Sequence, residues 1–328
     1  MAFSLLRFDL RHPDFSPVSS SELYSAALEM AAWADERGFD GLVVSEHHGT
    51  DDGFLPSPIA LMGALIGRTK RLRVSASALL LPLYDPIKLA EDLCILDITS
   101  GGRANLTVGI GYREVEYEMF GKDWASRGKR MDECLDVILR AWSGEPFEWN
   151  GRRVRLTPKP LTQPRPPIFV GGTAKVAARR AARFGLPFQP ANNDPAVLGL
   201  YTSECQRLGV ENPMLLPPGS GESIWVAEDP DRSWAEVGRY LLHEAMTYAG
   251  WQPKGQRTAV RSMATSVEEL RAENKYRILT PEECLKRAEE RGRFCDFSMH
   301  PLCGGTPPEF GWRSLELYAS QVLPQLEG

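Results

Sequence analysis

Short apolar segments alternate with longer amphipathic segments along most of the chain. Eight apolar segments have the length and composition of buried strands: Phe3–Leu10, Gly41–Val44, Leu72–Leu81, Arg103–Ile110, Ile168–Val170, Leu186–Pro190, Ile224–Ala227 and Phe294–Met299. The segments expected to form helices are Ser20–Arg37, Pro58–Arg68, Pro86–Ile98, Arg127–Trp142, Thr173–Phe184, Pro195–Leu208, Pro230–Tyr248, Pro281–Arg291 and Pro308–Leu323. This alternation predicts an α/β fold with a parallel sheet.

The number of strand–helix units favours a closed (β/α)8 TIM barrel, because an open doubly wound sheet usually has fewer. We expect one domain over residues 1–328, with insertions at about 144–160 and 251–280. In the first insertion, Asn150-Gly151 between two β-like segments predicts a hairpin over Phe147–Val154. The alternative is two doubly wound halves, for which the proline-rich stretch Thr157–Pro167 is the only candidate linker.

Composition narrows the class of protein. The formal net charge of -5 argues against a general binder of nucleic acid or anionic membranes, which needs a basic surface. The sequence contains no apolar stretch long enough to span a bilayer, and the charged N-terminus does not resemble a signal peptide. Six scattered cysteines form no CxxC pair, so we expect reduced thiols, no metal site and a cytoplasmic enzyme.

The carboxyl ends of barrel strands carry the active site, and a polar triplet follows the second predicted strand. Glu46, His47 and His48 stand where a core would be apolar, and histidine exchanges protons near pH 7. Because neighbouring residues of a strand point in opposite directions, only one of the two histidines can face the barrel mouth. His300 follows the eighth strand and could reach the same place. A pair of surface loop histidines is the alternative.

Small residues and glycines follow the third and fourth strands. Ser77 and Ala78 would let a flat ring approach the backbone, or they simply pack under a bulky neighbour. Gly111 leaves room for a ligand, while Tyr112 and Arg113 supply a hydroxyl and a cation. This segment lacks the GxGxxG pattern of dinucleotide-binding proteins, and an ordinary surface turn remains open.

A glycine pair leads from the fifth strand directly into a helix. Gly171, Gly172 and Thr173 would place free amides, a hydroxyl and the helix dipole around a phosphate. The alternative is a glycine turn followed by a threonine N-cap.

Taken together, these segments resemble the bacterial luciferase-like flavin monooxygenases. The resemblance is strongest over about residues 1–190. It rests on Glu46-His47-His48, Leu96–Arg103, Gly109–Tyr112, Glu118–Gly121, Pro166–Thr173 and Ala181–Pro187. It implies a (β/α)8 barrel that binds a reduced flavin or a deazaflavin relative.

The resemblance also implies roles for individual residues. His47 matches the catalytic histidine, Ser77-Ala78 the place of a non-prolyl cis peptide under the flavin ring, and Gly171–Thr173 the phosphate loop. Gly111 stands where luciferase has a cysteine, so light emission from an aldehyde is not expected.

Our first hypothesis is a two-component monooxygenase. A separate flavin reductase supplies reduced FMN, which reacts with O2 in a dry pocket. His47 acts as acid or base, Glu46 and His48 orient it or the flavin, and Tyr112 and Arg113 line the mouth. Trp251, in the second insertion, would cover a small organic substrate. We expect a homodimer.

Three alternatives remain. The first is an oxidoreductase that transfers hydride to or from a deazaflavin coenzyme without O2. The second is a catalytically silent flavin-binding protein, and the third is a sugar-phosphate enzyme that binds no flavin.

Overall fold

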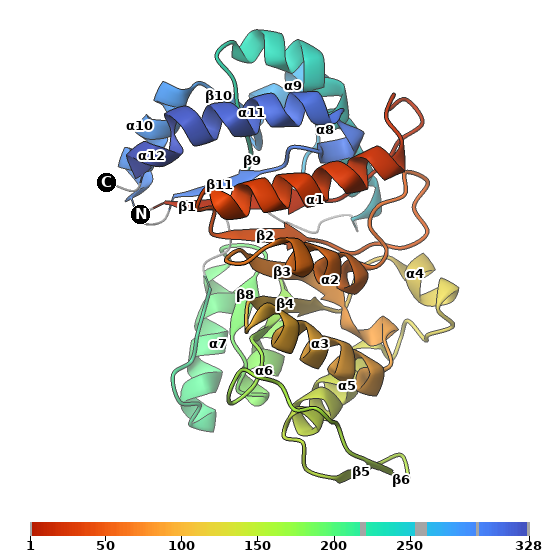
Figure 1. Cartoon of the computed structure of the whole chain (residues 1–328). Helices are drawn as coiled ribbons and strands as arrows, with labels where there is room; N and C mark the ends of the chain where they lie inside the picture. The colour runs from red at the N-terminus through yellow and green to blue at the C-terminus, as the bar shows by residue number, and fades with distance from the viewer. Residues whose placement is uncertain (1, 217–220, 253–260, 293–294, 327–328) are drawn as a thin grey trace. The chain divides into compact units, whose positions relative to one another are not determined.

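The computed structural model describes residues 2–216, 221–252, 261–292 and 295–326 (Figure 1). The chain forms two compact units. Unit 1 comprises residues 1–56 and 219–328, and unit 2 comprises residues 57–218. Both units alternate parallel strands with helices, so the predicted α/β class is confirmed. The expectation of a single domain stays a prediction.

Unit 1 is built on five parallel strands in the order β10-β9-β11-β1-β2. The strands are β1 (Phe3–Phe8), β2 (Gly41–Val44), β9 (Ser223–Val226), β10 (Tyr276–Leu279) and β11 (Asp296–Met299). The helices are α1 (Ser20–Glu36), α8 (Pro230–Trp251), α9 (Val267–Ala272), α10 (Pro281–Arg291), α11 (Pro308–Gln321) and α12 (Leu323–Leu326), with a 3-10 turn η3 at Cys303–Gly305. Helices α1 and α11 lie side by side over this sheet (Figure 1).

Unit 2 contains four parallel strands in the order β3-β4-β7-β8. The strands are β3 (Arg73–Leu80), β4 (Ala104–Gly109), β7 (Ile168–Gly172) and β8 (Phe188–Pro190). The helices are α2 (Pro58–Arg68), α3 (Pro86–Ser100), α4 (Glu114–Met119), α5 (Arg127–Trp142), α6 (Lys175–Arg183) and α7 (Pro195–Leu208), with a 3-10 turn η1 at Leu81–Leu83.

The predicted hairpin is confirmed as an antiparallel pair of β5 (Phe147–Trp149) and β6 (Arg152–Val154). Asn150 and Gly151 both have positive φ, at 49° and 68°, as a tight hairpin turn requires. The hairpin projects from unit 2 beside α5 (Figure 1).

The N-caps of α1 and α6 both differ from the residues that the sequence suggested. The cap of α1 is Ser19 rather than Ser20 or Ser21, because Ser19 and Glu22 form a reciprocal capping box. The predicted threonine cap of α6 is wrong. That helix begins at Lys175, Ala174 occupies the N-cap position, and no side chain accepts from its first amides.

The second predicted insertion contains regular elements: α8 extends to Trp251, α9 follows, and Tyr276–Leu279 forms β10 beside β9. That this segment is an insertion stays a prediction. Residues 253–260 of this insertion lie outside the described residues. β10 is thus a parallel strand in addition to the eight predicted. Helix α4, in the segment after β4, was also not predicted.

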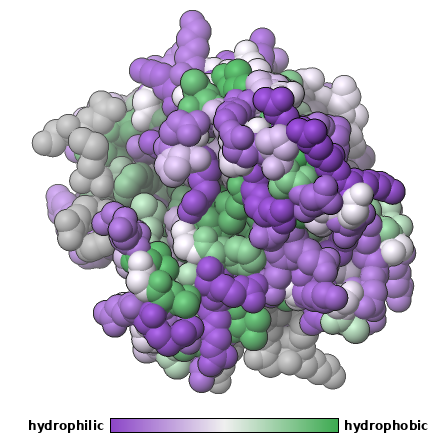
Figure 2. Space-filling view, turned by 90° about the horizontal axis from the view of Figure 1, so that it is seen from below, coloured by the Kyte–Doolittle hydropathy of each residue, from purple (hydrophilic) through white to green (hydrophobic). Residues whose placement is uncertain are grey.

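The surface is mainly polar. On the face shown in Figure 2, hydrophilic side chains predominate and small apolar patches lie between them. None of the described helices combines the length and apolarity needed to cross a bilayer. All six cysteines are buried free thiols.

Candidate functional site

The polar triplet lies directly after β2 and is buried. Glu46, His47 and His48 are 1%, 4% and 7% exposed, so the alternative of surface loop histidines is wrong. His48 Nε2 lies 2.8 Å from Glu46 Oε1. His47 donates its backbone N–H to Leu55 O at 3.3 Å, which holds the triplet against the following loop. His48 therefore has a carboxylate partner within the triplet.

The imidazole of His47 packs against three aromatic rings. Its centroid lies 4.8 Å from that of Trp251, 5.0 Å from Phe54 and 6.0 Å from Tyr248. Trp251 belongs to the last turn of α8, so it contacts the histidine from the end of a helix.

The same three rings surround a cation. The Arg11 guanidinium carbon lies 4.6 Å from the Phe54 centroid, 4.8 Å from that of Tyr248 and 4.7 Å from that of Trp251. Arg11 is 0% exposed, and a buried guanidinium between ring faces is held by cation–π attraction. The aromatic surface that positions His47 is therefore itself fixed by a buried charge.

Two carboxylates neutralise Arg11. Asp9 Oδ2 lies 3.1 Å from its Nε, and Asp52 Oδ2 lies 2.5 Å from its Nη1. His243 Nε2 also lies 2.8 Å from Asp52. Burial favours the neutral acid, but the bond to His243 and the charge of Arg11 outweigh it and hold the pKa of Asp52 well below its usual range.

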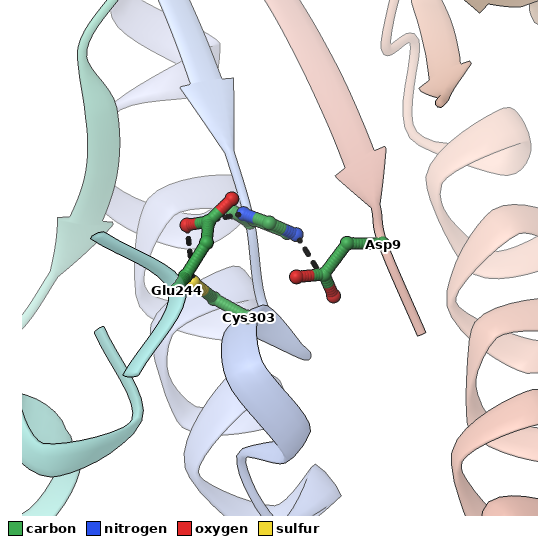
Figure 3. A group of neighbouring side chains, drawn as sticks. Asp9, Glu244 and Cys303 are labelled. Atoms are coloured by element: carbon green, nitrogen blue, oxygen red, sulfur yellow. Dashed lines mark hydrogen bonds and ion pairs between the residues drawn. The ribbon is translucent and has the colours of Figure 1, made fainter. Parts of the chain in front are cut away.

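A second group of buried polar side chains adjoins Asp9. Glu244 comes from α8, His300 follows β11, and Cys303 begins η3. Figure 3 shows Asp9, Glu244 and Cys303 pointing toward one another. His300 follows β11 as predicted, and its reaching the same place as the triplet stays a prediction. The sequence analysis missed Asp9, Glu244 and Cys303. The sequence pattern could have identified Asp9 and Glu244, because both are acidic residues within largely apolar segments.

In unit 2, the Ser77–Ala78 peptide bond is cis, as the resemblance implied. A β carbon on Gly109 of the neighbouring strand would lie 3.2 Å from the Ala78 Cβ, so small residues let these strands approach closely. Gly111 has a φ of +71°, which favours glycine. Arg113 pairs with the buried Glu116 at 3.1 Å. Its place at the mouth beside Tyr112 stays a prediction.

The glycine pair ends β7. A β carbon on Gly171 would lie 2.8 Å from Thr107 Cγ2, and one on Gly172 would lie 2.8 Å from the Ala177 Cβ. Both glycines are therefore required by close packing within the chain. The backbone from Gly171 to Thr173 remains partly exposed before the uncapped end of α6, so an anion can still reach it.

Polar side chains link the strands of unit 2. Ser75 Oγ bonds to Asn105 Oδ1 between β3 and β4, and Thr107 Oγ1 bonds to Gln189 Oε1, bringing β8 to β4. The sequence analysis did not single out these four residues. Polar residues at alternate positions of a strand are the signal, because they share one face of the sheet.

The structure brings the predicted residues together within each unit. In unit 1, the triplet Glu46–His48 forms one buried group. In unit 2, Ser77 and Ala78 lie one strand away from Gly109, and Gly171 lies against β4, the strand that leads to Gly111. The chemical roles assigned to these residues stay predictions.

Comparison with known proteins identifies relatives. Residues 5–291 match a family described as luciferase-like monooxygenase. The oxygenase component of flavin-dependent trigonelline monooxygenase from Acinetobacter baylyi is 28% identical over 212 residues, 60% of this chain and 59% of that protein. The chain spans about half to three fifths of the length of the curated relatives it matches.

Solved structures match nearly the whole chain. Monooxygenase RslO1 from Streptomyces bottropensis is 26% identical, with a TM-score of 0.74 over 99% of both chains. The oxygenating constituent of 3,6-diketocamphane monooxygenase from Pseudomonas putida, solved in complex with FMN, is 20% identical, with a TM-score of 0.72 over 99% of both chains. The luciferase-like fold predicted from the sequence is confirmed.

Proposed function

Because the chain belongs to the luciferase-like monooxygenase family, we propose that it oxygenates a small organic substrate with O2 and reduced FMN. The curated relative named as an oxygenase component is flavin-dependent, and a protein of the same fold binds FMN. When bound, the reduced flavin supplies the electrons and reacts with O2, which no side chain does alone. The protein's part is to bind, orient and shield.

The residues of unit 2 fit a flavin. The observation that carries the proposal is the start of α6. Its N-cap residue Ala174 offers no side-chain acceptor to the first amides, and the helix follows a partly exposed glycine pair. A flavin phosphate would supply the missing acceptor and meet the positive end of the helix dipole. Gly171, Gly172 and Thr173 would therefore hold the phosphate.

The ring of the flavin would lie beside β3 and β4. Ser77, Ala78 and Gly111 leave the backbone accessible to a flat group, and Tyr112 would border it. These four residues are our proposed ring contacts. The neighbouring Ser75 and Asn105 are half-buried hydrogen-bonding groups on the same strands, so a polar ring edge could also find partners there.

Unit 1 supplies the acid–base chemistry in this proposal. His47 would hold or transfer a proton during substrate oxidation, because an imidazole does so near neutral pH. Its apolar neighbours Trp251 and Phe54 exclude water from it. Glu46 and His48, 2.8 Å apart, would orient the loop that carries His47.

We further propose that reduced FMN comes from a separate flavin reductase. The glycines after β4 lack the GxGxxG pattern that would bind a nicotinamide dinucleotide. A chemically reduced FMN solution should then support turnover, whereas NADH with oxidised FMN should not. Reduction of FMN by the purified chain and NADH would contradict this part of the proposal.

The decisive test is an anaerobic titration with reduced FMN and with a reduced deazaflavin coenzyme, followed by addition of O2. We expect FMN to bind more tightly and O2 to be consumed. The variant Thr173→Val should weaken FMN binding about tenfold, the loss of roughly one charge-assisted hydrogen bond. Thr202→Val, on the exposed face of α7, is the matched control. Tight deazaflavin binding without O2 uptake would establish the alternative hydride-transfer enzyme.

A further inference from the structure

Four potential metal ligands lie together in the core of unit 1. Asp9, Glu244, His300 and Cys303 each offer one ligand atom, and these atoms lie within 4.8 Å of one another. All four residues are 0–1% exposed. Figure 3 shows that Asp9, Glu244 and Cys303 come from separate segments of the chain, and His300 follows β11. Nothing in the proposed flavin chemistry uses this cluster.

The imidazole of His300 has unusual surroundings for a buried polar group. Its Nε2 lies 3.4 Å from Asp9 Oδ1, and its Nδ1 lies 3.6 Å from Glu244 Oε2. Both are ion-pair distances, and neither nitrogen makes a hydrogen bond within the described part of the chain. Asp9 and Glu244 are thus ion-pair partners of the ring, but both separations are longer than a hydrogen bond, so the ring can accept a closer ligand.

We propose that His300 Nδ1, Glu244 Oε2 and Cys303 Sγ bind a zinc ion, while Asp9 holds the far side of the histidine ring. A metal-binding histidine usually donates its other N–H to a carboxylate, which is the relation of Asp9 to Nε2. Imidazole, thiolate and carboxylate together favour zinc over magnesium or calcium, which prefer oxygen ligands alone.

The distances are close to those a zinc ion needs. Bonds of about 2.0–2.3 Å in a tetrahedral arrangement place neighbouring ligand atoms roughly 3.3–3.8 Å apart. The separation from Nδ1 to Glu244 Oε2 is 3.6 Å. Cys303 Sγ lies 2.8 Å from the same oxygen in a hydrogen bond, which must open by about an ångström as the thiol loses its proton.

Charge balance accommodates the ion. The ionised side chains that adjoin the cluster are the carboxylates of Asp9, Asp52 and Glu244 and the guanidiniums of Arg7 and Arg11. Carboxylates outnumber guanidiniums in this set, and His243 also contacts Asp52, so the surroundings of the cluster favour a cation. Burial lowers the pKa of His300, but the charges of Glu244 and Asp9 outweigh it and raise the pKa.

Zinc would replace two protons. It displaces one from the His300 imidazolium and one from the Cys303 thiol, whose pKa is raised by burial and by Glu244. One divalent ion enters and two protons leave, so the net charge of the buried cluster does not change. Binding should therefore tighten as pH rises and release about two protons per ion.

The position of Glu244 on α8 would give the zinc ion a structural role near His47. Glu244 lies one helical turn before Tyr248 and two before Trp251 on α8, and those rings pack against His47. A metal held between α8, β11 and η3 would fix the helix that positions the histidine.

Metal content and spectroscopy test the proposal on the full chain. After treatment with a chelator and then zinc sulfate, the desalted protein should retain about one zinc per chain. Cobalt in place of zinc should produce a thiolate-to-cobalt absorption band. Cys303→Ser should remove that band and weaken zinc binding about 100-fold. Cys284→Ser, which changes another buried cysteine of unit 1, should leave both unchanged.

Three results would overturn the proposal. One is wild-type protein that retains no zinc, and another is cobalt binding without a thiolate band. The third is equal zinc retention by wild type and Cys303→Ser, which would indicate an adventitious ion only. If Cys303→Ser does not fold, proton release decides on the wild type alone: about two per ion supports the site, and none refutes it.

Discussion

At the scale of single residues, His47 combines a titratable ring with an apolar setting. Its ring packs against the rings of Phe54, Tyr248 and Trp251. We predict that His47→Gln lowers product formation about 100- to 10,000-fold, while the dissociation constant of reduced FMN changes little. Product formed per O2 consumed is the measurement. The control is His12→Gln, and an equal loss in both variants would contradict the assigned role.

Asp52 should control the acid limit of stability. Its folded pKa is depressed, so its contribution is complete above the usual carboxyl value of 3.8 and is lost as pH falls below it. We predict that Asp52→Asn lowers the free energy of unfolding by about 3 kcal/mol at neutral pH, because Arg11 loses a buried partner.

The measurement for Asp52 is urea unfolding between about pH 5 and pH 2. Wild type should lose stability more steeply over this range than Asp52→Asn. The exposed neighbour Asp51 provides the control Asp51→Asn, whose unfolding curve should follow wild type. Parallel curves for Asp52→Asn and wild type would show that the Asp52 pair does not govern acid unfolding.

Sequence alone could locate the triplet Glu46–His48 because consecutive polar residues at the end of a buried strand are conspicuous. It could not assemble Asp9 with Glu244 and Cys303, because more than two hundred positions separate Asp9 from the other two. The parallel pairing of β1 and β11 brings Asp9 near the segment that holds Cys303, and helix α8 adds Glu244. Arg11 was equally hidden, because a charged residue after a strand normally indicates the surface.

At the scale of elements, the start of α1 offers a clean test of capping. Ser19 accepts from the Glu22 amide, and the Glu22 side chain accepts from the Ser19 amide. We predict that Ser19→Ala lowers the free energy of unfolding by about 1 kcal/mol, measured by urea unfolding. Ser21→Ala, inside the first turn, should change it by less than about 0.5 kcal/mol. Equal effects would place the cap elsewhere.

The elements that prediction missed are short. β10 has four residues, Tyr276–Leu279, and follows a polar six-residue helix, so no hydrophobic period is long enough to identify either. Its pairing with β9 is a tertiary effect. Long helices such as α5 were predicted to the residue, because sixteen positions repeat the apolar spacing several times.

At the scale of the whole molecule, the homodimer stays a prediction from the family resemblance and from the frequency of two-fold assemblies. We expect light scattering on the purified chain to give twice the mass of one chain, with no change on addition of reduced FMN. Dilution should dissociate the dimer into single chains only when the area buried between the two chains is small. A single-chain mass at every concentration would contradict the expectation.

The burial of all six thiols has a consequence for the lifetime of an O2-using enzyme. If the proposed function holds, turnover without substrate would release hydrogen peroxide inside the protein. Thiols that are enclosed and protonated react slowly, as for Cys134, where burial raises the pKa to about 11. Damage should fall instead on surface methionines, first Met263 at 71% and Met119 at 65% exposure. Mass spectrometry after idle turnover should find sulfoxides there and intact cysteines.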